Sequence, residues 1–186
     1  MKLHRLLTAA LILSFATGHA FAETEKEKNR AEVRKIAQQA LDEFYKARPS
    51  LKADVARAPG YAVFTTYGLS FIFGGQVGKG LVHNNRTDKE TFMDMVQASA
   101  GLQAGLAESR ILIVFNTAQA MSEFSERGFE LTGAATAGAG VSTDTASATA
   151  GASMINNSPY YILTKTGLQA GGAFAGTKFF KDKKLN

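Results

Sequence analysis

Residues 60–82 read GYAVFTTYGLSFIFGGQVGKGLV, and this stretch decides the fold class. Over residues 61–65 and again over 69–73, apolar and aromatic side chains recur with a period of two, which is typical of β-strands. Gly74-Gly75 is a turn signal, so residues 77–82 are expected to return antiparallel to the first strand. The glycines at intervals along the stretch indicate places where another backbone layer approaches closely.

An amphipathic helix is predicted before these strands, over residues 31–46. From Val33 to Phe44, apolar residues fall at i, i+3, i+4, i+7, i+8 and i+11, while charged residues occupy the other faces. Pro49 disfavours a helical conformation in the residue before it, so the helix is expected to end there. A short turn-rich connection should follow as far as residue 60.

Further strands and one short helix are predicted after the first hairpin. Residues 98–106 and the apolar run 111–115 indicate a second pair of strands. Thr117 is a candidate N-cap for a short helix, and Gly128 is a candidate terminator. Strands are expected to resume at residues 160–164 and 168–175.

The segment 132–153 consists almost entirely of Gly, Ala, Ser and Thr. It reads either as a disordered linker or as strands with small side chains, and the alternation of Thr and Ala favours strands. Residues 66–80 and 164–178 also resemble each other, since each holds a Gly-Leu pair followed by a glycine-punctuated stretch. They are candidates for equivalent hairpins of a repeated sheet.

These elements together predict an α+β fold. A strongly bent, glycine-rich antiparallel sheet, curving toward a barrel, should be covered by the N-terminal amphipathic helix and by the second short helix.

The first 22 residues have the features of a cleavable secretory signal. Lys2 and Arg5 precede an apolar stretch over residues 6–15, and Ala20-Phe21-Ala22 is a small-residue cleavage site. A transmembrane anchor is the alternative, but the apolar stretch is shorter than the roughly 20 residues that crossing requires. No cysteine follows the cleavage site, so a lipid-anchored amino terminus is not expected. The mature chain is therefore expected in the periplasm, without a transmembrane helix.

The predicted organisation is a signal peptide at 1–22, a charged flexible start at 23–30 and a single domain at 31–186. The mature chain keeps 19 of the 21 basic residues and all 16 acidic ones, which gives a net charge of +3. Nucleic-acid binding needs a concentrated cationic footprint, so this small excess argues against it. Without cysteine, the apolar core alone must stabilise the fold.

Catalytic and cofactor chemistry finds little support in the sequence. Without cysteine, and with His83 the one histidine after the signal, no metal or cofactor is expected. The glycines and lysine of residues 73–80 do not match a phosphate-binding loop, because Gly80 stands where a hydroxyl residue is needed. A hydrolase-type enzyme stays as an alternative that would require His83 to meet carboxylates in the fold. The carboxylates considered are Asp88, Glu90 and Asp94.

The C-terminal tail suits an acidic lipid surface, because lysines alternate there with aromatic side chains. A solvated tail, or phenylalanines that belong to the core, are the alternatives. The candidate lipid-binding residues are Lys79, Arg86, Lys165, Lys178, Phe179, Phe180, Lys181, Lys183 and Lys184. The first three would widen the patch if the two similar hairpins lie side by side. The helix at 31–46 could also meet a membrane, but its acidic residues favour docking on its own core.

Several motifs, taken in order, resemble the SYLF domain family, in particular its exported bacterial branch. They are Gly60-Tyr61-Ala62-Val63-Phe64, the run 74–80 (GGQVGKG), the run 101–105 (GLQAG), Thr166-Gly167-Leu168 and the ending 176–186. The resemblance covers nearly the whole mature chain, and it implies lipid binding as a class. Eukaryotic members of the family bind phosphoinositide-bearing membranes, and the yeast member binds actin.

Departures from the family pattern limit what the resemblance implies. The chain has no tryptophan, so the family's W-S-x-P element is replaced around residues 89–92. An exported bacterial protein also meets no actin and little phosphoinositide. The expected partner is therefore an anionic phospholipid surface, bound without catalysis, with a protein of the cell envelope as the alternative partner.

Overall fold

The computed structural model of the chain describes residues 3–69, 75–98, 108–131, 154–155, 157–164, 167–170 and 176–186. Its helices are α1 (Leu3–Ala47), α2 (Ser50–Arg57) and α3 (Ala118–Arg127). The strands that form its first half are β1 (Gly60–Leu69), β2 (Gly75–Asn84), β3 (Lys89–Ala98) and β4 (Glu108–Val114). The remaining strands are β5 (Phe129–Leu131), β6 (Met154–Ile155), β7 (Ser158–Thr164), β8 (Gly167–Ala170) and β9 (Thr177–Lys181).

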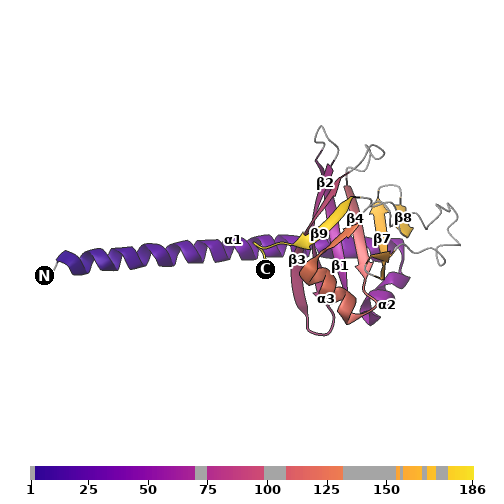
Figure 1. Cartoon of the computed structure of the whole chain (residues 1–186), viewed down its shortest axis with the longest axis horizontal. Coiled ribbons are helices and arrows are strands. Elements are labelled where there is room, and N and C mark those ends of the chain that lie inside the picture. The colour runs from indigo at the N-terminus through magenta and orange to yellow at the C-terminus, as the bar shows by residue number, and fades with distance from the viewer. Residues whose placement is uncertain are drawn as a thin grey trace.

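The strands form one curled antiparallel sheet in the order β5-β9-β3-β2-β1-β4-β7-β6, with β8 also paired to β7 (Figure 1). Every strand pair is antiparallel. The α+β class and the strongly bent antiparallel sheet predicted from the sequence are confirmed, and the sheet curls as far as a half-barrel. The last strand in the chain, β9, lies between β3 and the short edge strand β5, so the C-terminal residues lie near one edge of the sheet.

Each face of the sheet is covered by its own helices. The inner face of the curl packs against α3, around Phe64, Phe124 and Phe179. The outer face packs against α1 and α2, in a second cluster that includes Phe44 and Phe92. Because side chains alternate along a strand, neighbouring residues such as Val63 and Phe64 contribute to opposite clusters.

The predicted amphipathic helix is confirmed within α1, and it docks on the outer face of the sheet. Its buried residues are Val33, Ala37, Ala40, Leu41 and Phe44. The helix ends at Ala47, just before Pro49, as expected. It also continues through residues 23–30, which the sequence analysis assigned to a flexible start. Residues 23–30 contain neither glycine nor proline and consist mainly of good helix formers, so their charge does not interrupt the helix.

Helix α2 and the strands β3 and β9 are among the elements that were not predicted from the sequence. Residues 50–57 form α2 instead of a turn-rich connection, and its Leu51 and Val55 are buried one helical turn apart. Residues 177–181, read as part of a basic tail, form the strand β9. The predicted caps of α3 are confirmed, because the Thr117 side chain accepts a hydrogen bond from the Ala120 amide and Gly128 has a positive φ of 74°.

The antiparallel return of residues 77–82 along the first strand is confirmed, with Thr65 opposite Lys79. The predicted position of the turn, Gly74-Gly75, is wrong, because Gly75 is the first residue of β2 and pairs with Leu69. Residues 70–74, the segment 132–153 and all but the first residue of the strand predicted at 98–106 lie outside the described residues. The two similar segments are not equivalent, since one Gly-Leu pair ends β1 and the other begins β8. The strands β1 and β4 also separate β2 from β7, so the two hairpins do not lie side by side.

Candidate functional site

A group of exposed apolar and basic side chains lies on the outer face of β2, β3 and β9. We call it the outer patch; it consists of Val77, Lys79, Val96, Lys178 and Phe180. The three apolar members are exposed to 40%, 39% and 37%, in the order Val77, Val96 and Phe180. Exposure of three large apolar side chains on one face marks a candidate contact surface.

Strand register explains how the outer patch is assembled. Val77 lies opposite Val96, and Val96 lies opposite Lys178, so these three form one row across the sheet. In the next row, Asp94 lies between Lys79 and Phe180. Residues far apart in the chain thereby become neighbours on one face.

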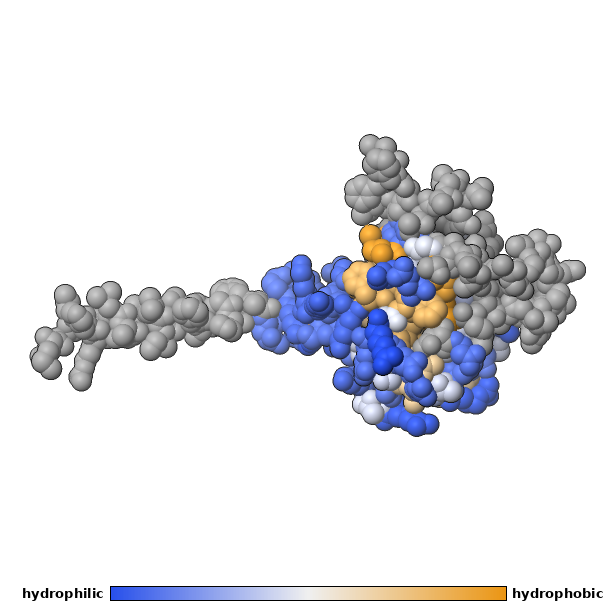
Figure 2. All heavy atoms as spheres, in the orientation of Figure 1, coloured by the Kyte–Doolittle hydropathy of each residue, from blue (hydrophilic) through white to orange (hydrophobic). Residues whose placement is uncertain are grey.

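The outer patch is exposed because α1 does not cover its two rows of residues. The helix covers the rows of the same face that begin with Leu81 and Phe92. Leu81 and Phe92 form the next row, and both are buried in the cluster that α1 closes. Figure 2 shows orange, apolar residues gathered in the upper part of the described body, beside the hydrophilic surface of α1. The patch therefore borders the docked helix rather than lying under it.

Both lysines of the outer patch are engaged by carboxylates. Lys79 Nζ lies 3.1 Å from Asp94 Oδ1 and 3.3 Å from Asp182 Oδ2. Burial alone would lower the pKa of Lys79, but its hydrogen bonds and charge interactions with Asp94 and Asp182 outweigh burial and raise that pKa. Lys178 Nζ lies 3.3 Å from Glu130 Oε2 across β9 and β5. The patch is thus apolar at its centre, with its charges partly compensated.

The two phenylalanines of the tail have different environments. Phe179 is fully buried against Phe64 and Phe124, with ring centroids 4.8 Å and 5.3 Å away, so it belongs to the inner core. Phe180 points to the opposite face and is partly exposed. The alternative that the tail phenylalanines belong to the core is therefore realised for Phe179, which is not available to a membrane.

Three lysines at the end of β9 and just after it are exposed and carry uncompensated charge. Within the described residues, Lys181, Lys183 and Lys184 have no carboxylate within ion-pair distance. The first ends β9, and the other two lie in the turn of residues 182–186 that follows it. Because side chains alternate along β9, Lys181 lies opposite Met93 on the same face as Phe179, away from the outer patch. The uncompensated charge beside the outer patch therefore comes from the turn that carries Lys183 and Lys184.

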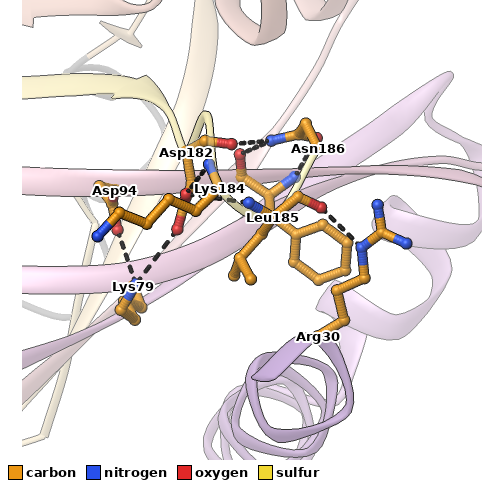
Figure 3. Close-up of polar contacts among 8 residues, drawn as sticks. Arg30, Lys79, Asp94, Asp182, Lys184, Leu185 and Asn186 are labelled. Carbon is orange, nitrogen blue, oxygen red and sulfur yellow. Dashed lines mark hydrogen bonds and ion pairs between the residues drawn. The ribbon is translucent and has the colours of Figure 1, made fainter. Parts of the chain in front are cut away.

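The turn of residues 182–186 is fixed by Asp182 and Asn186 (Figure 3). The Asp182 carboxylate accepts hydrogen bonds from the backbone amides of Lys184, at 2.8 Å, and Leu185, at 3.2 Å. The Asn186 side chain accepts from the Phe92 amide at 3.1 Å and donates to the Phe92 carbonyl at 2.7 Å. The turn thus presents its lysines from a defined position at the edge of β3.

The remaining two sequence-predicted residues do not join the patch. Arg86 lies in the turn between β2 and β3, at the end of this hairpin away from Val77. Lys165 lies outside the described residues. Of the predicted set, the fold brings together Lys79, Lys178, Phe180 and the turn that carries Lys183 and Lys184, while Lys181 faces the opposite side of the sheet.

Sequence reasoning missed Val77 and Val96, because β3 was not recognised as a strand. Its alternating pattern is visible in the sequence and places Phe92, Asp94 and Val96 on one face of a strand. The missing information was the pairing between β2 and β3, which depends on register rather than on composition.

The carboxylates considered for an enzymatic site have separate partners. Asp88 is 96% exposed at its side chain and lies 3.5 Å from His83 Nε2, whereas Glu90 accepts a 2.6 Å hydrogen bond from Arg34. Asp94 is bound by Lys79. The cleft of about 320 Å³ between α1 and the sheet is lined by Glu90, without Asp88, Asp94 or His83. These side chains do not converge on one cavity.

Metal and membrane-spanning features are missing from the part of the chain that the structure describes. There, no cluster of three or more histidine or acidic side chains is arranged to hold a metal ion. Among the same residues, no helix has both the length and the apolar character needed to cross a bilayer.

Comparison with known proteins gives two similarities. Residues 96–186 match the model of the Ysc84 family, described as Las17-binding protein actin regulator. A protein of Aeromonas veronii named Beta cell expansion factor A is 30% identical over 165 residues, which are 88% of this chain. The chain spans about 60% of the length of that relative. The match to the family begins in β3 and includes β9 and the turn of residues 182–186.

Proposed function

Because residues 96–186 match the model of the Ysc84 family, and the motifs of the chain resemble the SYLF family, we propose that it is a non-enzymatic binding protein that associates reversibly with anionic phospholipid. The match to the family supports a binding role in general. The choice of an anionic lipid surface rests on one observation, the exposed apolar outer patch bordered by the turn that carries Lys183 and Lys184. The N-terminal sequence favours the periplasm as the compartment.

The lysines supply the attraction in this proposal. Each lysine near an anionic membrane contributes about 1 kcal/mol, so Lys183 and Lys184 together contribute about 2 kcal/mol. Lys181 contributes less, because it ends β9 on the opposite face of the sheet. Lys79 and Lys178 contribute less, because Asp94, Asp182 and Glu130 already compensate their charges. A contribution of this size supports weak, reversible attachment.

Shallow insertion of the apolar side chains adds to the attraction. Val77, Val96 and Phe180 are each about two-fifths exposed, so complete burial of each contributes about 1 kcal/mol. The apolar face of α1 does not take part, since Val33, Leu41 and Phe44 are buried against the sheet. The sheet, rather than the amphipathic helix, faces the lipid in this arrangement.

Liposome co-sedimentation tests the proposal. The purified chain is mixed with neutral or anionic vesicles at low and at high salt. We expect binding to anionic vesicles that weakens with salt, because exposed charges are screened beyond about 8 Å at physiological ionic strength. Changing Lys181, Lys183 and Lys184 to Gln should reduce binding by at least tenfold, and Phe180→Ser should reduce it further.

A matched control removes the same charge from another surface. Lys28, Lys46 and Lys52 are exposed on α1 and α2, and changing all three to Gln should leave most of the binding. Equal loss in the two triple variants would show that only net charge matters and would contradict a site at the outer patch. If no vesicles bind the chain, the lipid proposal fails, and the outer patch is then better explained as a surface for a protein partner.

A further inference from the structure

The Asn186 side chain takes the place of a strand residue beside β3. Its amide both accepts from the Phe92 amide and donates to the Phe92 carbonyl, which is the pattern of one backbone residue in an antiparallel pair. The same amide donates to the Asp182 carbonyl at 2.6 Å. The turn of residues 182–186 is therefore attached to the sheet at a point beyond β9.

The same turn also holds α1 through two basic side chains. Arg30 Nε donates to the Leu185 carbonyl at 2.6 Å (Figure 3). Lys26 Nζ donates to the main-chain oxygen of Asn186 at 2.9 Å. In residues 23–32, the partly buried side chains are those of Lys26 and Arg30, one helical turn apart. This stretch of α1 thus meets the rest of the molecule mainly through the turn.

Apolar contact strengthens the attachment. Leu185 is 6% exposed and belongs to the outer-face cluster with Val33 and Phe92. The Arg30 and Arg34 guanidinium groups lie 5.7 Å and 5.3 Å from the centroid of the Phe92 ring. Phe92 is therefore the residue at which the turn, β3 and α1 meet.

We propose that residues 182–186 form a strap that controls whether the first docked turns of α1, residues 26–37, stay on the sheet. The later turns are held independently by Ala40, Leu41 and Phe44, which are at most 5% exposed. Opening the strap releases residues 26–37 and exposes Val33 and Ala37, while the rest of α1 stays docked. This device does not depend on the proposed lipid function.

Hydrogen exchange measured by mass spectrometry tests the strap. Asn186 is exposed, so Asn186→Ala removes its three side-chain hydrogen bonds without leaving a cavity. We expect amide exchange within residues 26–37 to become about five- to tenfold faster, with β1, β4 and α3 unchanged. Asn186→Asp should act similarly, because a carboxylate cannot donate to the Phe92 carbonyl.

Variants in α1 test whether faster exchange comes from loss of the strap or from a general weakening of the helix. Arg30→Ala should accelerate exchange in the same residues, and Lys28→Ala, an exposed position in the same turn, should not. Arg30→Ala should also add less in the Asn186→Ala background than in the unmodified chain, since both changes break one attachment.

Three results would overturn the inference. They are unchanged exchange of residues 26–37 in Asn186→Ala, acceleration that spreads equally to β1 and β4, and an effect of Lys28→Ala as large as that of Arg30→Ala.

Discussion

Gly80 is a position where the sheet leaves no room for a side chain. A Cβ atom there would collide with the Val63 carbonyl oxygen and would lie 2.6 Å from the Phe64 Cδ1 atom. Neither can yield, because one is backbone of the neighbouring strand and the other is a fully buried ring. We expect Gly80→Ala to lower the free energy of unfolding by about 2 kcal/mol, measured by urea denaturation.

Gly78 on the same strand and face is the matched control for this prediction. A Cβ atom at Gly78 would lie 3.0 Å from the Thr65 carbonyl oxygen and 3.4 Å from Cε of Met95, which is the end of a flexible side chain. Gly78→Ala should therefore cost clearly less than Gly80→Ala. Equal costs would show that the close approach at Gly80 is not what limits the side chain.

The raised pKa of Tyr45 predicts how the free energy of unfolding changes at alkaline pH. Burial, followed by the charges of Tyr61 and Asp42, raises its pKa from the ordinary value of 10.0 to about 12. The Tyr45 hydroxyl therefore ionises at lower pH in the unfolded chain than in the folded one. Its ionisation favours the unfolded chain, so the free energy of unfolding falls as pH rises from about 10 to 12. The Tyr45→Phe variant should lose less stability over that range. Parallel pH profiles of the two proteins would contradict the assignment.

Among the helices and strands, α3 is stabilised by an N-terminal cap that the sequence predicts. The Thr117 Oγ1 atom accepts a 3.1 Å hydrogen bond from the Ala120 amide, which would otherwise lack a helical partner. Thr117→Ala should lower the free energy of unfolding by about 1 kcal/mol, and Thr117→Ser should restore most of it. Thermal unfolding followed by circular dichroism checks both; a serine variant as unstable as the alanine variant would point to packing instead of capping.

Elements with strong local signals were predicted, and those defined by distant pairing were not. The α1 core segment, the first hairpin and α3 carry periodicity and caps in their own residues. In contrast, β9 has only five residues and becomes a strand because β3 and β5 lie on either side of it. Its alternation alone does not tell which phenylalanine faces the core; the pairing of Met95 with Phe179 decides that.

Across the whole molecule, the candidate site also depends on distant pairing, which the sequence does not predict. The lysines of the tail could be named from composition, but the outer patch joins residues 77, 96 and 180 through two strand registers. The compensation of Lys79 by Asp182 joins positions more than a hundred residues apart. Such contacts are consequences of topology, which local sequence patterns do not encode.

Export is the prediction that involves the whole chain. The small residues Ala20 and Ala22 should direct cleavage before Glu23, so the protein recovered from the periplasm of an expressing bacterium should begin at Glu23 by intact mass. The docking contacts described for α1 run from Lys26 to Phe44, all of which follow that point. Cleavage should therefore leave the unfolding midpoint unchanged, whereas Ala22→Phe should block processing because the site requires small side chains. A mature chain that begins elsewhere, or one that remains in the cytoplasm, would contradict the export assignment and with it the choice of the periplasmic membrane surface as the binding partner.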